Sequence, residues 1–425
     1  MSQMPATPLS NAIDVNARLH RYLGLWLLIA LSVYVSSIYF YMGSESAHRK
    51  IYYIAIVLPF FVFVAWRPSF LRTLKHSRIM LLTLTMACLA VASVFYGDRY
   101  NLTEDLYDGV RYGLLILLLM ALFSYLAVID KRYPTYFVAV VGLASAVSAA
   151  HFTTQYFIDM GRIAIGPRMD MGIGYASHTI RMAELFAVGA LAALAQWSRS
   201  TDHRMQTLWL GCVALSVGPM LLAQSRGPLL ALVCAATAMC CLQRRWWTIA
   251  SVMGIAVGMG AILLLLDIGY RDFSTVSSIN VRFAIWKGAI SDILQNPVLG
   301  VGWIDMANIS TEVRGRFHQT HNIYLSVLLQ GGVIGFIVFL ALLVRGLFVG
   351  ATKLDSAPEF AAGFLILVFF TVNGLVMTRW IYDNPALAWL QFWIPLGLLV
   401  IGELNDRRRA GESEGDVGRV DQDRL

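Results

Sequence analysis

Long apolar runs separated by charged turns are the feature that most restricts this 425-residue chain. Crossing the hydrocarbon core of a bilayer takes about 20 residues of helix, and the runs have that length. A membrane β-barrel would show short segments of alternating polarity instead, and no such pattern is visible. Only 14% of the residues are charged, which is too few to cover a water-soluble fold. The sequence therefore predicts an all-α integral membrane protein.

The apolar runs predict about 12 transmembrane helices. Their expected ranges are 22–42, 51–66, 79–96, 109–129, 135–157, 178–197, 206–224, 228–243, 248–267, 323–344, 359–378 and 386–403. The run at 22–42 is too long for a signal-peptide core and has no small-residue cleavage site, so we interpret it as an uncleaved anchor. We expect a cytoplasmic segment at 1–21, a single membrane domain at 22–403 and a disordered cytoplasmic tail at 404–425.

The distribution of basic residues predicts how the chain is oriented, because Lys and Arg favour cytoplasmic loops. With the N-terminus inside, most basic turns fall inside, including those at 67–78, 131–132, 199–204, 244–245, 345–353 and 407–409. The opposite orientation would place the acidic turn with Glu104, Asp105 and Asp108 inside. Both termini are therefore predicted to be cytoplasmic, with a large loop at 268–322 on the outer face.

Several arginines run against this bias and lie on the predicted outer face. They are Arg162, Arg168, Arg181, Arg226, Arg271, Arg282, Arg314, Arg316 and Arg379. A cation at membrane depth costs at least ~2.5 kcal/mol, so such a residue faces a partner or a wet cavity. Guanidinium groups bind phosphate oxygens bidentately, so converging arginines would suit a diphosphate at the membrane surface. Two structural alternatives stay open: Arg181 could pair with Glu184, and Arg226 could anchor to lipid headgroups.

The outer loop at 268–322 contains recognisable elements rather than a plain linker. Phe283, Trp286 and Ile290 share one face of a predicted amphipathic surface helix. A tight turn is expected where Asn-Pro at 296–297 is followed by two glycines before residue 303. His321 lies where the next span begins, and its neutral imidazole could accept a proton near pH 7. His318 competes for that role, and a capping role for His321 stays open.

No cofactor is predicted. The five cysteines lie scattered within predicted spans and form no metal or disulfide pattern. No cluster of carboxylates and histidines suggests a divalent metal. We also expect no nucleic-acid partner, whereas membrane lipids surround such a chain. The sequence leaves the oligomeric state open.

Three motifs in a fixed order resemble the superfamily of bacterial O-antigen ligases and O-antigen polymerases. The first is Ser-Arg-Gly at 225–227, at the outer end of a span. The second is Arg282 with Trp286, then Asn-Pro at 296–297 and Gly-Val-Gly-Trp at 300–303. The third is His321-Asn322, followed after nine residues by Gly-Val-Ile-Gly at 332–335. The third motif is similar to the ligase version of the signature, and the detailed resemblance covers about residues 205–345.

The resemblance implies an activity, a fold and a location. Such enzymes use a glycan carried on undecaprenyl diphosphate, and a ligase passes it to a sugar hydroxyl of lipid A–core. The architecture would be similar to that of GT-C membrane glycosyltransferases, in a Gram-negative inner membrane with a periplasmic active site. Matching positions imply that His321 is catalytic and that Arg226 and Arg282 bind the diphosphate. Further candidates for substrate binding are Arg162, Arg168, Arg181, Arg314, Arg316, His318, Trp286 and Asn322.

Three other functions remain as alternatives. A polymerase would join carrier-linked repeat units, and a related transferase would attach the glycan to protein. A relative that glycosylates protein usually has an extra soluble C-terminal domain, whereas only about 20 polar residues follow the last predicted span. A transporter of lipid-linked glycan would place polar groups near the midplane, whereas here the ionisable residues crowd the outer face.

Overall fold

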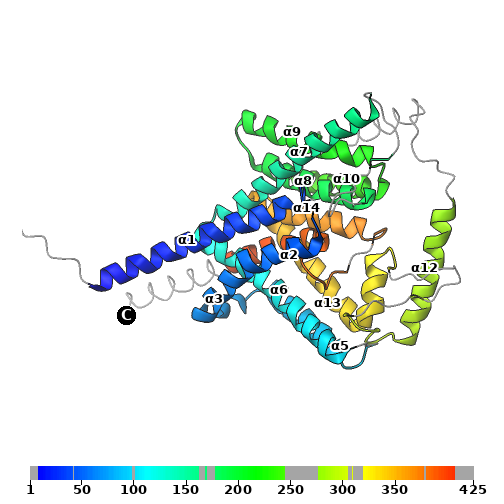
Figure 1. Ribbon diagram of the computed structural model, residues 1–425, viewed down its shortest axis with the longest axis horizontal. Coiled ribbons are helices and arrows are strands. Elements are labelled where there is room, and N and C mark those ends of the chain that lie inside the picture. The colour runs from blue at the N-terminus through cyan, green and yellow to red at the C-terminus, as the bar shows by residue number, and fades with distance from the viewer. Residues whose placement is uncertain are drawn as a thin grey trace, which may run out of the picture.

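Helices make up most of the described part of the chain (Figure 1). The computed structural model describes residues 8–41, 43–97, 101–161, 168–169, 178–244, 276–304, 309, 319–377 and 380–406. The elements are α1 (Pro8–Ser37), α2 (Glu45–Tyr52), η1 (Tyr53–Val57), α3 (Leu58–Trp66), α4 (Ser69–Leu74), α5 (Arg78–Ser93), α6 (Leu102–Ile129), α7 (Tyr133–Met160), α8 (Thr179–Arg199), α9 (His203–Leu222), α10 (Arg226–Leu242), α12 (Val276–Gln295), α13 (Ile323–Lys353), α14 (Pro358–Asn373) and η3 (Trp389–Trp393). Helix also surrounds η3 over 387–406.

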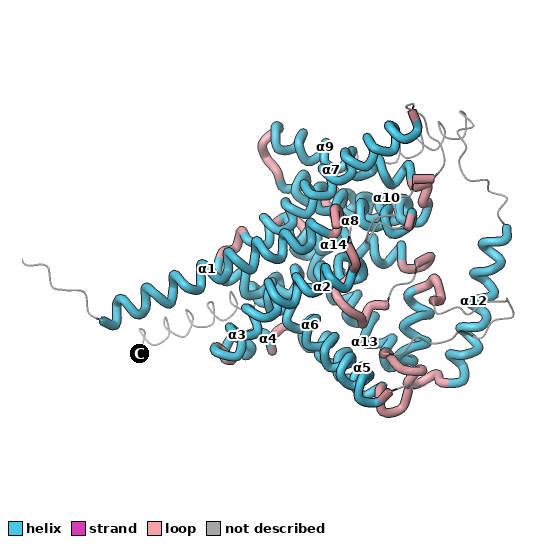
Figure 2. Tube along the Cα trace, viewed as in Figure 1, coloured by secondary structure: helices cyan, strands magenta, loops and turns pink. Residues whose placement is uncertain are grey.

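Every predicted span that falls on described residues coincides with a helix, and the span at 248–267 lies outside them. Seven described helices or continuous helical stretches are long and apolar enough to cross a membrane, and α5, α10 and α14 are shorter apolar helices. The chain is therefore a multi-pass helical membrane protein. Figure 2 shows α12 apart from the main group of helices, at the end of the molecule opposite the start of α1.

Three helices, α1, α2 and α6, begin at least six residues earlier than the hydropathy pattern predicted, and α6 begins at Leu102 rather than at 109. α1 begins at Pro8, because the polar residues before the apolar run include no further proline or glycine to interrupt a helix. α2 begins at Glu45, and the Ser44 side chain accepts a hydrogen bond from the Ala47 amide at 3.2 Å. The acidic Glu45 suits the positive end of the helix dipole. Hydropathy detects the apolar part of a helix, so it misses such polar first turns.

A buried polar cluster links several helices at the centre of the bundle. Glu184 on α8 is fully buried and accepts hydrogen bonds from Asn373 Nδ2 at 2.9 Å and Gln391 Nε2 at 3.2 Å. A buried carboxyl group is tolerated only with such partners. The cluster therefore ties α8 to the end of α14 and to η3, close to where α13 begins.

Helix α13 is broken at Gly332, and the loop at 296–303 fills the break. Gly332 has φ 57° and ψ −163°, a backbone conformation that is essentially restricted to glycine. The Val333 amide donates to the Pro297 carbonyl at 2.9 Å, and the Leu329 carbonyl accepts from the Val301 amide at 2.9 Å. The loop thus satisfies backbone groups that a break within the membrane would otherwise leave without partners.

Trp303 fixes this loop against α13. Its side chain is fully buried, and its ring lies where a Cβ on Gly331 would come within 2.3 Å and one on Gly335 within 2.8 Å. The Trp303 amide also donates to Ser93 Oγ on α5 at 3.0 Å. The two glycines of the third motif therefore have separate tasks: Gly332 permits the break and Gly335 makes room for the indole.

Replacing Gly332 by alanine should strongly destabilise the protein. The backbone conformation alone costs about 1–3 kcal/mol for a non-glycine residue. The new Cβ would also lie 2.3 Å from the backbone of Val298, which cannot move without disturbing the loop. Thermal unfolding in detergent should show a clearly lower midpoint. Gly211→Ala on α9 is the matched control, because nothing lies within 4 Å of its Cβ position and its midpoint should stay the same or rise. Equal midpoints for the two variants would contradict this account of the break.

Candidate active site

A cavity of about 470 Å³ lies where several helices begin. α2, α8 and the helix after His321 all contribute residues at or next to their N-termini, and α6, α12 and the segment at 377–388 complete the wall. The charged and titratable lining residues are Glu45, Tyr112, His178, Arg181, Arg282, His321, Tyr382 and Asp383. Helix N-termini favour anions, as do the two arginines. The cavity therefore combines helix N-termini, two guanidinium groups and two carboxyl groups with side chains that can exchange protons.

His321 is held in a sparsely populated backbone conformation at the start of α13. Its φ is +52°, which is uncommon for a residue other than glycine. The capping role belongs to the next residue: Asn322 Oδ1 accepts from the Tyr324 amide at 2.9 Å and from the Leu325 amide at 3.2 Å. The alternative that His321 caps this helix is therefore wrong. Its half-buried imidazole lines the cavity instead.

Arg282 and His321 lie close enough to interact electrostatically. Burial of the imidazole lowers the pKa of His321 below its ordinary value of 6.5, and the positive charge of Arg282 lowers it further. Both residues line the same cavity, although one comes from α12 and the other from the start of α13. The ring therefore stays neutral near pH 7, which is the form that can accept a proton.

Trp286 connects α12 to the residue before His321. Its indole Nε1 donates a hydrogen bond to the Thr320 carbonyl at 2.9 Å. The Thr320 hydroxyl donates to the Asn322 carbonyl at 2.5 Å and accepts from the Asn322 amide at 3.2 Å, and Thr320 itself is 1% exposed. Trp286 and Asn322 thus shape the turn that carries His321. The face of α12 with Phe283 and Ile290 stays exposed, as an amphipathic surface helix would have it.

Trp286→Phe should impair the site without unfolding the protein. Phenylalanine keeps an aromatic ring in place but cannot donate to the Thr320 carbonyl, and a lost hydrogen bond to a buried group costs about 1–3 kcal/mol. We expect the rate of the reaction at this site to fall about tenfold through kcat, because the turn with His321 loosens. Ile290→Ala on the same helix is the control, because its side chain is exposed and should contribute little. Equal rates in both variants would contradict a positioning role for Trp286.

Arg226 lies at the first residue of α10, beside the same end of α14 that contacts the His321 turn. A Cβ on Gly227 would lie 2.9 Å from Val376 Cγ2. Asn322 Nδ2 donates to the Leu375 carbonyl at 3.3 Å, and the Ile323 amide donates to the Gly374 carbonyl at 2.8 Å. Segment 374–376 therefore touches both turns. Arg226 is exposed and does not line the 470 Å³ cavity, so this shared segment is what connects its turn to the cavity residue His321.

Arg168 supports the turn that precedes Arg226. Its Nε donates to the Ala223 carbonyl at 3.0 Å and its Nη2 to Ser225 Oγ at 3.3 Å. Arg168 matched no motif in the sequence, yet it contacts the first motif directly. The structure thus brings an arginine from the loop before α8 to the Ser-Arg-Gly turn.

Arg181 faces the cavity and pairs with a residue that hydropathy placed in a turn. Its Nη1 lies 3.7 Å from Glu45 Oε1. The alternative partner from the sequence, Glu184, lies in the buried cluster with Asn373 and Gln391 instead. Glu184 follows Arg181 by three residues, but packing against α14 turns its carboxyl group toward the bundle.

Two acidic residues of the cavity were missed by the sequence analysis, Glu45 and Asp383. Burial raises the pKa of Asp383, although its Oδ1 accepts from the Asn384 amide at 2.6 Å. Both lie between predicted spans on the predicted outer face, so the orientation argument applied to acidic residues would have found them. Among the described residues, no group of three or more His, Cys, Asp or Glu side chains is placed to hold a metal ion.

Several expected site residues lie outside the described part of the chain. They are Arg162, Arg271, Arg314, Arg316, His318 and Arg379. His321, the competing histidine of the same loop, lies on the wall of the cavity with Arg282.

Comparison with known proteins finds similarity to O-antigen ligases. A family model described as O-antigen ligase matches residues 211–340, which include all three motifs. The O-antigen ligase of Pseudomonas aeruginosa strain PAO1 is 24% identical over 402 residues, which is 93% of this chain and 96% of that protein. The match runs along almost the whole length of both chains. The chain is therefore a multi-pass membrane protein that is similar, over almost its whole length, to an O-antigen ligase.

Proposed function

We propose that this protein is an O-antigen ligase that transfers glycan from undecaprenyl diphosphate to a sugar hydroxyl of lipid A–core. The observation that carries the proposal is the pairing of His321 with Arg282 on one cavity wall. The Ser-Arg-Gly turn with Arg226 lies beside the same end of α14. A proton acceptor next to fixed cations is what transfer from a diphosphate requires.

The proposed reaction is a single displacement at the anomeric carbon. His321 takes the proton from the acceptor hydroxyl as its oxygen attacks, and the bond from the anomeric carbon to the diphosphate oxygen breaks. The configuration at that carbon inverts, and undecaprenyl diphosphate leaves with the bonding electrons. Arg226 and Arg282 stabilise the negative charge that develops on the leaving group. These fixed cations would act in place of a divalent metal ion.

The remaining outer arginines have supporting roles in this proposal. Arg168 orders the turn of Arg226 through its contacts with Ala223 and Ser225. Arg181, in its ion pair with Glu45, presents a second guanidinium to the cavity. Arg162, Arg314, Arg316 and His318 remain candidates for contacts with the glycan or the acceptor.

We place the reaction at the periplasmic face of a Gram-negative inner membrane. The positive-inside pattern supports this orientation, because it assigns the α12 end of the molecule to the outer face. Figure 1 shows α12 at the end of the molecule away from the start of α1, whose N-terminus is proposed to be cytoplasmic. The donor's lipid chain would remain in the bilayer while its diphosphate enters the cavity.

Gel analysis of lipopolysaccharide from a deletion strain tests the proposal and separates it from a polymerase. A ligase mutant should show lipid A–core without any O-antigen, together with accumulated carrier-linked glycan. A polymerase mutant would instead show core bearing one repeat unit. Core with a single repeat, or an unchanged ladder, would contradict the ligase assignment.

The pH dependence of transfer should report on His321. The base acts in its neutral form, so kcat/KM should stay constant from neutral pH downward and fall only below pH 6.5, where the lowered pKa lies. The fall in kcat/KM at low pH is the acid limb of the profile. Arg282→Gln removes a positive charge that disfavours the protonated ring, so the pKa of His321 should rise and the acid limb should move to higher pH. A pH profile of purified protein measures both positions. An acid limb that does not move would argue against the proximity of the two groups.

A further inference from the structure

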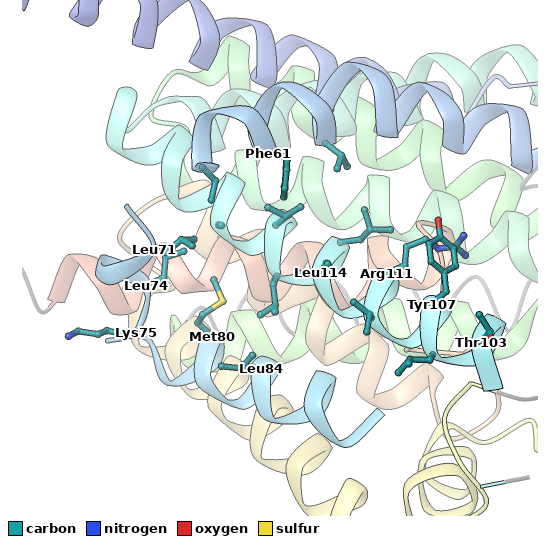
Figure 3. A pocket seen from close by; sticks show the side chains of 18 of the residues that line it. Phe61, Leu71, Leu74, Lys75, Met80, Leu84, Thr103, Tyr107, Arg111 and Leu114 are labelled. Carbon is teal, nitrogen blue, oxygen red and sulfur yellow. The ribbon is translucent and has the colours of Figure 1, made fainter. Parts of the chain in front are cut away.

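An apolar groove runs along one side of α6, and Figure 3 shows side chains that line it. It has a volume of about 1000 Å³ and is lined by residues of η1, α3, α4, α5 and α6. Leu84 and Leu114 lie in it with 45% and 52% of their surface exposed, so the groove is open to lipid. Nearly every lining side chain between its ends is aliphatic or aromatic.

Polar residues stand at both ends of this groove. Figure 3 shows Thr103, Tyr107 and Arg111 at one end and Lys75 at the other. On α6 the lining runs from Leu102 to Ala121, which corresponds to ~28 Å at 1.5 Å per residue. That length approaches the full hydrocarbon thickness of about 30 Å, whereas one leaflet accounts for about half of it. The groove therefore extends through both leaflets.

The outer end of the groove adjoins the candidate active site. Arg111 lines the groove, and Tyr112, the next residue, lines the 470 Å³ cavity. Arg111 Nη2 lies 3.0 Å from Asp108 Oδ1 and donates to Asn384 Oδ1 at 3.2 Å. Asn384 also donates to the Tyr112 hydroxyl at 3.2 Å and follows Asp383 of the cavity wall. One layer of hydrogen-bonded side chains thus joins the groove to the cavity.

We propose that this groove binds the polyisoprenoid chain of the donor, an inference that rests on the proposed function. The length of the groove decides between candidate lipids. An acyl chain of a phospholipid or of lipid A ends within its own leaflet and would fill about half of the groove. An undecaprenyl chain is longer than one leaflet and can follow the groove to its inner end. Apolar contact along this length would hold the donor while its diphosphate reaches the cavity.

Binding of two free diphosphates to the purified protein in lipid nanodiscs tests the assignment. Leu84→Trp should fill the inner part of the groove, since Leu84 lies about six residues into α5 from its cytoplasmic end. Affinity for undecaprenyl diphosphate should fall about tenfold, because several methylene contacts are lost. Affinity for farnesyl diphosphate should change much less, because its short chain occupies only the outer end. The measured quantity is the ratio of the two affinities.

Leu215→Trp is the matched control. Leu215 lies on α9 outside the groove and is 47% exposed, so the added surface is similar. Its affinity ratio should equal that of the wild type. An unchanged ratio in Leu84→Trp, or an equal fall in both variants, would overturn the inference and indicate that ordinary bilayer lipids fill the groove. These measurements do not depend on glycan transfer, so failure of transfer by the wild type would count against the proposed function alone.

Discussion

Replacing His321 by alanine should lower glycan transfer by about 10²- to 10⁴-fold, the usual contribution of a positioned general base. Cells that carry only the His321→Ala variant should then show unmodified core lipopolysaccharide and accumulated carrier-linked glycan. The protein should still fold, because Asn322 rather than His321 caps α13. The activity loss should therefore appear with an unchanged thermal midpoint.

The design of this experiment separates loss of the base from general damage. His151→Ala provides the control, since His151 lies on the exposed side of α7 and does not line the cavity. Its lipopolysaccharide ladder should be normal. A normal ladder in the His321→Ala strain would remove His321 from the reaction and leave His318 as the remaining histidine of that loop.

Removing the positive charge of Arg226 or Arg282 should also lower the rate of transfer strongly. Removing one group that stabilises developing charge costs about 10²–10³ in rate. We expect losses of that size for Arg282→Ala and for Arg226→Ala, measured as kcat with purified protein. Arg282→Lys should recover only part of the activity, because an ammonium group keeps the charge but not the bidentate geometry.

The same assay tests whether the arginines act in place of a metal ion. Wild-type transfer should be unaffected by EDTA, since the proposed charge stabilisation comes from Arg226 and Arg282. Loss of activity with EDTA, restored by Mg²⁺, would show that a divalent ion supplies that charge. Full activity in either alanine variant would remove that arginine from the diphosphate site.

The sequence predicts the helices well because hydropathy measures what membrane insertion requires. It does not predict the break at Gly332, since the apolar run at 323–344 continues through it without interruption. The break depends on a partner loop 28 to 36 residues earlier in the chain, whose amides and carbonyls replace the missing helical hydrogen bonds. Such non-local compensation has no signature in the hydropathy of either segment. In the sequence, the only trace of this compensation is the pair of glycines at 332 and 335, whose structural role hydropathy does not reveal.

The candidate site is predicted in part, and the reason differs from residue to residue. Arg282 was predicted from its positive charge on the outer face, and both Arg282 and His321 from the motifs. The structure places both residues in the lining of one cavity. Glu45 was missed because it lies in the polar first turn of a spanning helix. Arg181 carried no sequence signal for its partner, since Glu45 is 136 positions away. The contact of Arg168 with Ser225 likewise comes from packing of distant segments.

Reconstitution with purified substrates tests the central claim most directly. The protein would be placed in vesicles with undecaprenyl-diphosphate-linked glycan and lipid A–core, in the presence of EDTA, and the products separated on a gel. We predict glycan-bearing lipopolysaccharide with the wild-type protein and none with His321→Ala. Movement of the carrier across the bilayer without any glycan transfer would contradict the account and indicate a transporter.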